Sequence, residues 1–585
     1  MYDLLITNAR IVDGSGAPAY AGSVAIEDGR IAAVGAVDGP AAETLDAGGK
    51  VVSPGFVDVH THYDAQVFWD PTLSPSCFHG VTTVFGGFCG FSIAPLTAQS
   101  APYMLRMLSR VEGMPETSLT QGVPWSWRSF ADYLALLDGK VGINAGFMVG
   151  HSALRTAVMG DRARGSEASA EEVEEMRRLL TTSIAEGAMG FSSTVSPTHN
   201  DADGQPVPSR YTTRDELVTL ASACRDYEGT SLEFMPGLGA FSEESIDLII
   251  EMSSSAGRPL NWNTLHAGDA ALAEHQLAIA DRARAAGGEI VALTSAQYPT
   301  TRINLHSGFL FDALPGWGEL FRLSIEDRIE ALKSPELREE LDRRKGEAIG
   351  QLRAYTNWDN YLIDAAFGPE TRPLEGRTIG ALAAEQGRPP LDVMFDIAIA
   401  DDLRTSFILN ESADGDAIWQ QRARLWGDDR TVIGGSDAGA HLDMIDTFAM
   451  SSMLLSRGVR EHGLISLEQA VRQLTSVPAQ LLGLRERGRL EIGYHADLVV
   501  FDPDTSDRGP VYMRRDLPGD ETRVYADALG IDYVFVNGTK IVEKGNHTGA
   551  LPGKVLRSGK DTVTPSLPLD AGLAPRVMEQ EPVPA

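Results

Sequence analysis

The chain has 585 residues, and 43% of them are hydrophobic, so it is too long for one small domain and can bury a large core. Its formal net charge of −31 is the opposite of what nucleic acid or anionic lipid attracts, so we expect neither as a partner. The three cysteines are too few for a disulfide framework, and we find no signal peptide and no apolar run of about 18 residues. We therefore expect a cytoplasmic protein without a membrane span.

The first part of the chain predicts a small β-domain. Between residues 2 and 53, short apolar runs are separated by turn pairs such as Asp13-Gly14 and Asp28-Gly29. Strands bounded by such pairs are typical of hairpins. We assign residues 1–55 to this domain.

Residues 56–483 predict a (β/α)8 barrel. Apolar runs alternate with helix-like segments in this part of the chain. The predicted strands start at Phe56 and continue at 80–85, 143–149, 188–192, 230–234, 260–264, 289–293 and 431–435. The predicted helices include 170–186, 214–227, 243–256, 270–287 and 378–402. This pattern favours an α/β fold of the TIM-barrel type, in which catalytic groups stand at the carboxyl ends of the strands.

An insertion of about 300–372 interrupts this alternation. It contains several aromatic residues and a highly charged stretch, Pro335–Lys345. Long insertions on the active-site side of a barrel often cover the site, so a lid is one interpretation. A packing or dimer contact, and with it a homo-oligomer, is the other.

The last part of the chain returns to a β pattern. Two apolar runs, Gly493–Phe501 and Tyr533–Val542, carry this pattern, and Asn537-Gly538 inside the second is a strong hairpin signal. We expect residues 484–557 to join residues 1–55 in one small β-sandwich. Residues 558–585 are rich in proline and small residues and predict a tail.

His60 and His62 follow the start of the first predicted barrel strand. In an extended chain alternate side chains point the same way, so the two imidazoles face one side. Two histidines at a strand end can hold one metal ion, although a pair of surface or core histidines has the same spacing.

Three further strand ends carry candidate residues. Cys89 follows the second strand, and a thiolate is a good zinc ligand, although a small buried cysteine is the plainer alternative. Asp437 follows the eighth strand, where it could bind a metal, accept a proton or merely cap the next helix. His266 follows the sixth strand and could equally be a core or surface histidine. Together, at one end of a barrel, these residues suggest a metal-dependent hydrolase.

The motifs around these residues extend over most of the chain. The strand ends carry Pro54–Asp64, Gly80–Pro95, Gly150–Arg155, Gly187–Ser193 and Gly434–Asp437. The distal part carries Asp516–Pro518, Val536–Gly538 and Thr548–Arg557. On these motifs the chain resembles the amidohydrolase superfamily and, within it, the D-aminoacylase, or N-acyl-D-amino-acid deacylase, family.

The resemblance implies a zinc-dependent amidohydrolase that acts on a non-peptide C–N bond of a small-molecule amide. The implied reaction is removal of the acyl group from an N-acyl-D-amino acid by a metal-activated water. Cys89 would take the role of the family's metal-binding cysteine. Asp437 would accept the proton of the water and pass it to the leaving amine.

Two strand ends depart from the family pattern. After strand five the family has a metal-binding histidine, where this chain has Glu233. After strand six the family has a His-His-Lys run, where this chain has Asn261–His266. Glu233, with His266 as a further candidate, could replace the missing ligands. We favour instead one tightly bound Zn²⁺ held by His60, His62, Cys89 and Asp437.

The missing lysine weakens the case for a free α-carboxylate on the substrate. Arg155, Tyr298 and His266 are the candidates for contact with the substrate, although a surface arginine and a packed tyrosine are plainer alternatives. Hydrolysis of a cyclic amide, as in hydantoinases, or of another small amide is the alternative activity. A barrel that has lost catalysis and serves in binding is the alternative outside the enzymes.

Overall fold

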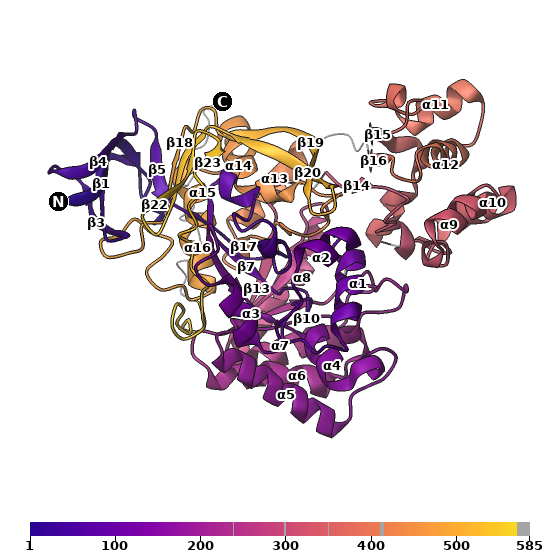
Figure 1. Cartoon of the computed structure of the whole chain (residues 1–585), viewed down its shortest axis with the longest axis horizontal. Coiled ribbons are helices and arrows are strands. Elements are labelled where there is room, and N and C mark those ends of the chain that lie inside the picture. The colour runs from indigo at the N-terminus through magenta and orange to yellow at the C-terminus, as the bar shows by residue number, and fades with distance from the viewer. Residues whose placement is uncertain (238, 298–299, 349, 410–414, 570–585) are drawn as a thin grey trace.

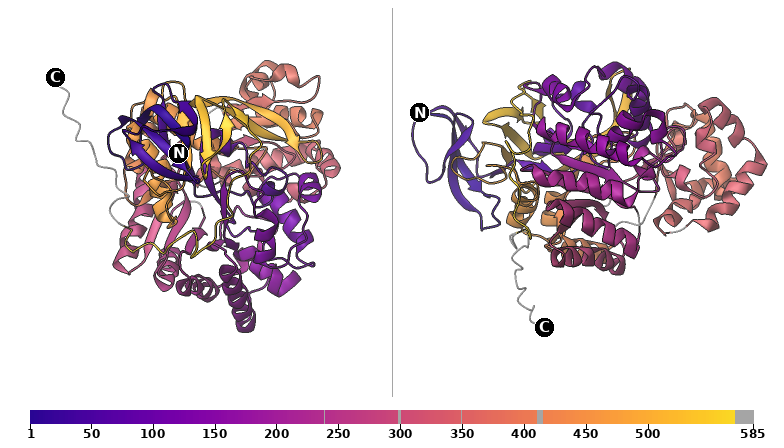
Figure 2. Two further views of the ribbon diagram at one scale, coloured as in Figure 1. Left: turned by 60° about the vertical axis from the view of Figure 1, so that its left-hand side comes forward. Right: turned by 90° about the horizontal axis from the view of Figure 1, so that it is seen from below.

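The computed structural model describes residues 1–237, 239–297, 300–348, 350–409 and 415–569. A central α/β body lies between a β-sheet at one end and a mainly helical unit at the other (Figures 1 and 2). Among the described residues, no helix combines the length and the apolar character that crossing a membrane requires.

The body is built on parallel strands that follow one another along the chain. One sheet contains β6 (Phe56–Asp58), β7 (Val81–Gly86) and β8 (Asn144–Phe147). The other pairs β9 (Val149–Gly150), β10 (Gly190–Thr194), β11 (Ser231–Met235), β12 (Pro259–Leu265), β13 (Glu289–Thr294) and β17 (Thr431–Ile433). Only Met148 separates β8 from β9, so the predicted strand 143–149 spans both sheets. The α/β part of the fold prediction is confirmed.

The first and last strands of this series meet through a few backbone contacts. Thr61 and Ala438 form an isolated parallel bridge. The His62 amide donates to the Ala438 carbonyl at 2.8 Å, and the Asp437 amide donates to the His60 carbonyl at 3.2 Å. The described strands do not pair into one continuous closed sheet. Asp437, with φ of 50°, leaves the extended conformation that a strand needs.

Helices surround these strands (Figure 1). They are α1 (Ala101–Val111), α2 (Glu116–Gly122), α3 (Phe130–Leu137), α4 (His151–Met159), α5 (Ala170–Ala185), α6 (Arg214–Ser222), α7 (Glu243–Ala256), α8 (Ala270–Ala285), α13 (Asp416–Trp426), α14 (Met450–Met453), α15 (Leu467–Leu474) and α16 (Ser476–Leu481). As predicted, α5 begins after Ser169, whose hydroxyl accepts from the amide of Glu172 while the Glu172 carboxylate accepts from the amide of Ser169. Its residues Met176, Leu180 and Ile184, four apart, are buried in the main core.

Both chain ends contribute to one nine-stranded sheet. The N-terminal strands are β1 (Tyr2–Ile11), β2 (Tyr20–Glu27), β3 (Arg30–Gly35), β4 (Ala41–Asp46) and β5 (Val51–Pro54). The C-terminal strands are β18 (Leu498–Phe501), β21 (Ile531–Val536), β22 (Thr539–Glu543) and β23 (Asn546–His547). The ends join where β5 pairs antiparallel with β18, with Val52 opposite Val500. The paired strands form one sheet, so the sandwich stays a prediction.

The predicted Asn537-Gly538 hairpin connects β21 to β22. Both residues have positive φ, 48° and 81°, as a two-residue hairpin turn with the twist of the strands requires. A second hairpin, β19 (Asp507–Leu517) with β20 (Glu521–Leu529), leaves this sheet and reaches the body, where the Val524 amide donates to the Leu442 carbonyl.

Residues 302–409 form a separate insertion unit (Figure 1). Its elements are β14 (Arg302–Ile303), α9 (Ile325–Leu332), α10 (Pro335–Arg343), β15 (Tyr361–Ala365), α11 (Ile379–Gln386), α12 (Pro390–Ala400) and β16 (Ser406–Leu409). The strands pair in the order β14-β16-β15, and a hydrophobic core of their own runs from Ile303 to Phe407. Because the unit has its own core, it folds beside the body rather than inside it.

The predicted bounds of this insertion, about 300–372, and the predicted helix 378–402 need correction. The latter is two helices, because Gly387 ends α11 with φ of 62° and Pro390 occupies the first turn of α12. Both helices pack into the insertion core rather than onto the barrel strands. The unit therefore continues to β16.

The insertion unit docks on the chain segment that follows Asp437. The Arg302 amide donates to the Met444 carbonyl at 2.9 Å, and the Asn304 side-chain amide donates to Asp443 at 2.7 Å. The Phe309 ring lies 4.4 Å from the ring of His441. The unit thus touches the loop that carries the predicted general base.

The segment predicted as a tail, 558–585, is described up to Leu569. The Val563 amide donates to the Gly483 carbonyl at 2.8 Å, and the Leu569 amide donates to the Glu289 carboxylate at 3.1 Å. This part of the tail therefore packs on the body.

Gly190→Ala tests how closely β10 and β11 approach each other. Gly190 has φ of 137°, and a Cβ there would stand 1.9 Å from the Ser231 carbonyl oxygen of the paired strand. We expect a loss of about 3 kcal/mol or more, seen as a lower Tm in calorimetry. Gly165→Ala is the control, since Gly165 has φ of 84° but open space around its Cβ position, and should cost about 1 kcal/mol. Equal shifts in Tm would contradict this account.

Candidate metal centre

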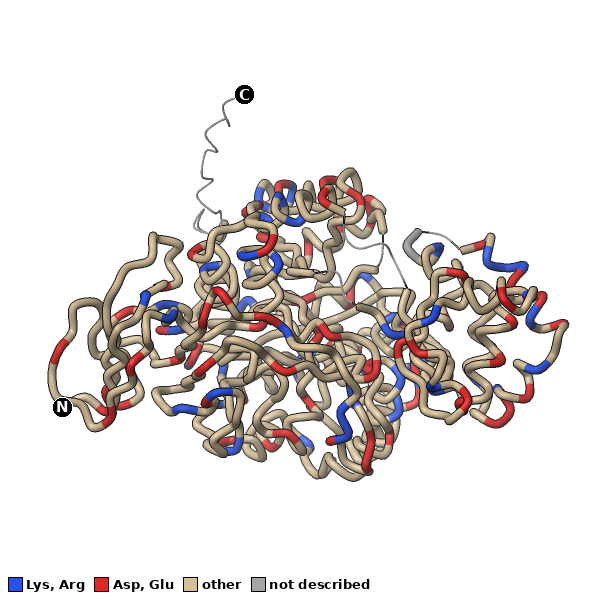
Figure 3. The backbone as a smooth tube through the Cα atoms, turned by 90° about the horizontal axis from the view of Figure 1, so that it is seen from above, with Lys and Arg blue, Asp and Glu red and all other residues tan. Residues whose placement is uncertain are grey.

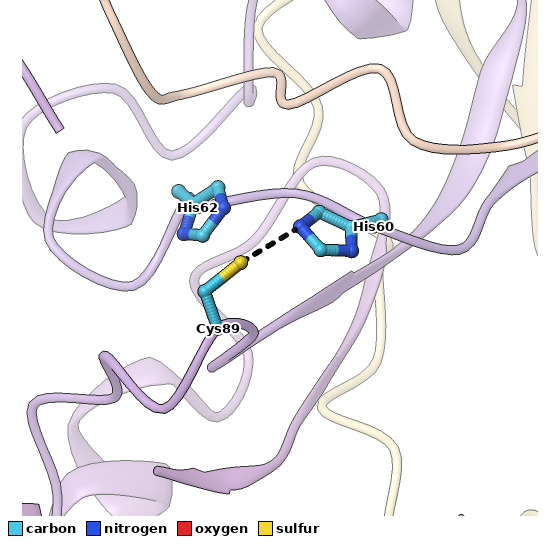
Figure 4. Close-up of side chains that lie close together, drawn as sticks. All are labelled: His60, His62 and Cys89. Carbon is cyan, nitrogen blue, oxygen red and sulfur yellow. Dashed lines mark hydrogen bonds between the residues drawn. The ribbon is translucent and has the colours of Figure 1, made fainter. Parts of the chain in front are cut away.

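His60, His62 and Cys89 converge at the carboxyl ends of β6 and β7 (Figure 4). One donor atom from each lies within 4.8 Å of the other two, and all three side chains are buried. The Cys89 sulfur is 3.6 Å from Nε2 of His60. Asp437 joins them from the end of β17, with Oδ1 3.1 Å from Nε2 of His60 and 3.6 Å from Nε2 of His62.

The donor atoms fit one metal ion. In a tetrahedral zinc site, ligand atoms stand about 3.3–3.8 Å apart, because each lies about 2.0–2.3 Å from the ion. The distances from Nε2 of His60 to the Cys89 sulfur and from Oδ1 of Asp437 to the two imidazoles, 3.6, 3.1 and 3.6 Å, lie in or near that range. Two imidazoles, a thiol and a carboxylate are also the donor types that zinc prefers.

Local backbone geometry sets these positions. Cys89 lies in a tight turn after β7, with φ of 53°. The preceding Gly87 has φ of 78°, and a Cβ there would stand 2.4 Å from the Met148 carbonyl oxygen. Its amide donates to the Asp64 carboxylate at 2.8 Å. This turn directs the thiol back toward the histidines.

The charges in the cluster favour a cation. Burial opposes the charged form of Asp437, but His60 and His62 outweigh it and hold its pKa well below the usual range. Burial lowers the pKa of His60. Burial also raises the pKa of the Cys89 thiol well above its usual range, and neighbouring carboxylates, Glu233 first, add to that effect. A bound cation would therefore be needed to stabilise the thiolate.

Glu112 belongs to the site and was not predicted. It follows α1, and its Oε1 lies 3.2 Å from Nδ1 of His62. Burial lowers the pKa of His62, but Glu112 and Asp437 outweigh burial and raise it to about 9. A carboxylate that accepts from one imidazole nitrogen directs the other nitrogen toward a metal. No motif or periodicity in the sequence marks Glu112 for this position.

The ends of β11 and β12 also reach the cluster. Glu233 accepts the Cys89 amide at 2.9 Å, and its other oxygen is 3.9 Å from the Cys89 sulfur. Burial raises the pKa of Glu233 well above its usual range. The Asn263 side-chain amide lies 3.5 Å from Nε2 of His60 and 4.0 Å from the Cys89 sulfur. Polar groups thus stand where the family pattern has histidines.

The sequence predicts contacts with the substrate at three residues, His266, Tyr298 and Arg155. His266 is not part of the donor cluster; burial and the charge of Arg422 lower its pKa. Tyr298 lies outside the described residues. Arg155 is fully buried and forms an ion pair with Glu216 at 2.5 Å. Its predicted contact with the substrate therefore does not fit, because no part of its side chain is exposed.

The same buried network contains a serine, a histidine and a glutamate. Nδ1 of His151 lies 2.8 Å from the Ser193 hydroxyl, and Nε2 lies 2.8 Å from Glu216. In a hydrolytic triad the serine faces Nε2 and the acid faces Nδ1, which is the reverse. All three side chains are buried, so the network supports structure rather than nucleophilic catalysis.

His199 and His441 lie near the open side of the cluster. The Asp437 side chain is 28% exposed while His60 is 0% exposed, so the site opens toward Asp437. Burial and the charges of His441 and His62 lower the pKa of His199 to about 3. Burial lowers the pKa of His441 to about 4. Both imidazoles are therefore neutral at physiological pH.

The chain is similar to known proteins over most of its length. A model described as the amidohydrolase family covers residues 43–542. The chain belongs to the amidohydrolase family. A D-aminoacylase of Alcaligenes xylosoxydans xylosoxydans is 30% identical over 561 residues, which cover 95% of this chain and 97% of that relative. The predicted resemblance to the D-aminoacylase family is confirmed.

Solved structures of amidohydrolases are similar to this chain over almost its whole length. A D-aminoacylase described with a binuclear metal center has a TM-score of 0.64 at 26% identity, covering 95% of this chain and 100% of its own. An N-acyl-D-glutamate deacylase from Bordetella bronchiseptica, complexed with zinc and a phosphonate inhibitor, has a TM-score of 0.65 at 26% identity with the same coverage. An L-hydantoinase from Arthrobacter aurescens has a TM-score of 0.51 at 16% identity over 95% of this chain and 100% of its own, a likeness of fold alone.

Glu112→Gln should weaken zinc binding by about 10- to 100-fold, because an amide is a poorer acceptor for the His62 ring N–H than a carboxylate. Competition with a chromophoric chelator measures the affinity. Glu116→Gln, at an exposed position in the first turn of α2, is the matched control. Equal zinc affinity in both variants would contradict a role for Glu112.

Zinc uptake by the metal-free protein should release protons at pH 7.5. The thiol pKa of Cys89 lies above that pH, and the pKa of His62 is about 9, so both groups must lose a proton to become ligands. Calorimetry in buffers of different ionisation enthalpy counts the protons. At saturating zinc, Cys89→Ser should release about one proton fewer, whereas Cys224→Ser, at a buried position outside the cluster, should match the wild type. Unchanged release in Cys89→Ser would exclude the thiol as a ligand.

Proposed function

We propose that the protein is a zinc-dependent hydrolase that removes the acyl group from an N-acyl-D-amino acid. The observation that carries this proposal is the convergence of His60, His62 and Cys89 with Asp437 at the strand ends of an amidohydrolase. The name of the D-aminoacylase relative, which matches almost the whole chain, supports the substrate class.

His60, His62 and Cys89 would hold the ion, and Asp437 would complete the set or face it. The ion would supply Lewis-acid polarisation of the scissile carbonyl and activation of water. The zinc complex of the related N-acyl-D-glutamate deacylase supports this choice of metal. Glu112 would hold His62 in the orientation that points Nε2 at the ion.

Asp437 would move the proton. Its low pKa keeps it ionised at neutral pH, so an oxygen of its carboxylate can accept a proton from the attacking water. The water oxygen bonds to the carbonyl carbon, the C–N bond breaks, and the proton passes from Asp437 to the leaving nitrogen. The products are a carboxylic acid and a free amine.

We infer one tightly bound ion rather than two. Glu233 and Asn263 occupy the strand ends where the family pattern has histidines, and both make hydrogen-bond contacts with Cys89. The related D-aminoacylase is described with one-metal activation, which supports a single ion as sufficient.

We also infer that the strands close into a barrel beside a β-sandwich and that the protein is cytoplasmic. The contacts between Thr61 and Ala438 support closure of the strands into a (β/α)8 barrel, with the sheet from both chain ends as part of a β-sandwich. The three cysteines are unpaired and buried, which supports a cytoplasmic location.

Hydrolysis of a cyclic amide is the alternative activity. The hydantoinase described above is similar in fold alone, whereas the D-aminoacylase matches almost the whole chain in sequence, so the linear substrate is favoured. A screen of N-acyl-D-amino acids, N-acyl-L-amino acids and cyclic amides against the zinc-loaded protein separates these activities. Turnover of cyclic amides alone would replace the proposal, and a binding protein would turn over none of the three classes.

Asp437→Asn should lower kcat for an N-acyl-D-amino acid by about 10²- to 10⁴-fold, because the amide cannot accept the proton of the attacking water. The assay is run at saturating zinc, with metal content measured on the same sample. Asp416→Asn, at an exposed position in the first turn of α13, is the control and should keep full activity. A zinc-replete Asp437→Asn enzyme with wild-type kcat would exclude the proposed mechanism.

A further inference from the structure

We propose that Arg210 binds a carboxylate of the substrate at a subsite beside His199. The inference rests on the proposed deacylase function and adds the residue that recognises the acid. It starts from a problem of charge. The chain has a formal net charge of −31, with acidic and basic residues interspersed over the molecule (Figure 3), so an anionic substrate needs a local cation.

Lysine does not provide that cation in the body. Lys140 is the only lysine between residues 56 and 300. It is exposed, and its ammonium group donates to the Leu136 carbonyl at the end of α3. The cation must therefore be an arginine, whose planar guanidinium also suits a carboxylate better.

The arginines of α1 and of the loop after α4 are already neutralised. Arg106 and Arg164 both pair with Asp203. Arg110 pairs with Asp312 of the insertion unit at 2.6 Å. A substrate carboxylate would have to displace an existing carboxylate at each of these positions.

Arg210 differs from them. It lies in the short 3₁₀ turn Pro208–Tyr211 and is half-buried. Its Nη1 donates to the His199 carbonyl at 3.1 Å and to the Asn200 side-chain oxygen at 2.6 Å. Within the described residues it has no carboxylate partner, and Nε and Nη2 donate to no protein group. Two neutral acceptors thus orient the guanidinium through Nη1. The edge formed by Nε and Nη2 can then donate to a ligand.

This placement is costly unless an anion binds. Burial lowers the pKa of Arg210, because its half-buried guanidinium has lost part of its hydration. A partly desolvated guanidinium is stabilised by a carboxylate that accepts two parallel N–H bonds. A substrate carboxylate is the anion that the proposed reaction supplies.

His199 connects Arg210 to the cluster. Nδ1 of His199 lies 2.8 Å from the Thr194 hydroxyl at the end of β10. Its ring lies 5.0 Å from the ring of Phe91, two residues after Cys89. The contacts therefore run from the donor cluster through Phe91 and His199 to Arg210. An acid whose scissile carbonyl lies at the cluster would extend its carboxylate past His199 to Arg210.

The test compares substrates with and without the carboxylate on the zinc-loaded full chain. The substrates are N-acetyl-D-leucine, N-acetyl-D-leucinamide and N-acetyl-D-glutamate. In Arg210→Gln we expect kcat/KM for the two acids to fall by about 10- to 100-fold, mainly through KM, because a charge-assisted hydrogen bond is lost. The neutral amide should change by less than about twofold, and Arg210→Lys should recover part of the loss.

The two acids separate the sources of the carboxylate. A larger loss for N-acetyl-D-glutamate than for N-acetyl-D-leucine assigns Arg210 to the side-chain carboxylate, and equal losses assign it to the α-carboxylate. Arg214→Gln, at an exposed position paired with Glu251, is the matched control. Equal losses on the acids and on the amide, or no loss on any substrate, would overturn the proposal.

Failure of the deacylase function gives a different result. In that case the wild type cleaves none of the three compounds, and calorimetry of their binding decides about Arg210. Weaker binding of the acids alone in Arg210→Gln supports the subsite. Binding that the substitution leaves unchanged overturns it.

Discussion

The contact between Asp437 and the histidines after β6 supports both the fold and the site. The Asp437 amide donates to the His60 carbonyl, and its carboxylate lies against both imidazoles. Next to it, Ser436 hydrogen-bonds to the buried carboxyl of Asp58. The last parallel strand is therefore joined to the first at the place where the donor atoms meet. The position of Asp437, the proposed proton acceptor, is set by the same bonds that bring the ends of the strand series together.

The strand ends were predictable because buried parallel strands leave a strong pattern. An apolar run ends abruptly, and the polar residue that follows it lies at one edge of the sheet. This reasoning brought His60, His62, Cys89 and Asp437 to one place, and Glu233 beside them. It could not decide which way a long side chain turns. Arg155 follows its strand as expected but turns toward Glu216, whose position depends on how α6 packs.

The residues that sequence reasoning missed come from loops. Glu112 follows an ordinary amphipathic helix, and Arg210 lies in a short turn between β10 and α6. Neither has a periodic pattern or a motif, so the path of the loop through space decides that Glu112 reaches His62 and that Arg210 reaches His199. The insertion bounds failed for a related reason. α11 and α12 look like barrel helices in sequence, and only their core partners reveal that they belong to the insertion unit.

The insertion unit has its own hydrophobic core and meets the body at several places, among them the loop around His441, Asp443 and Met444 and the ion pair of Asp312 with Arg110. Within the described residues, this core is separate from the cores that pack around the parallel strands. The loop that follows Asp437 is thus held from two sides, by its bonds to the residues after β6 and by its contacts with the insertion unit.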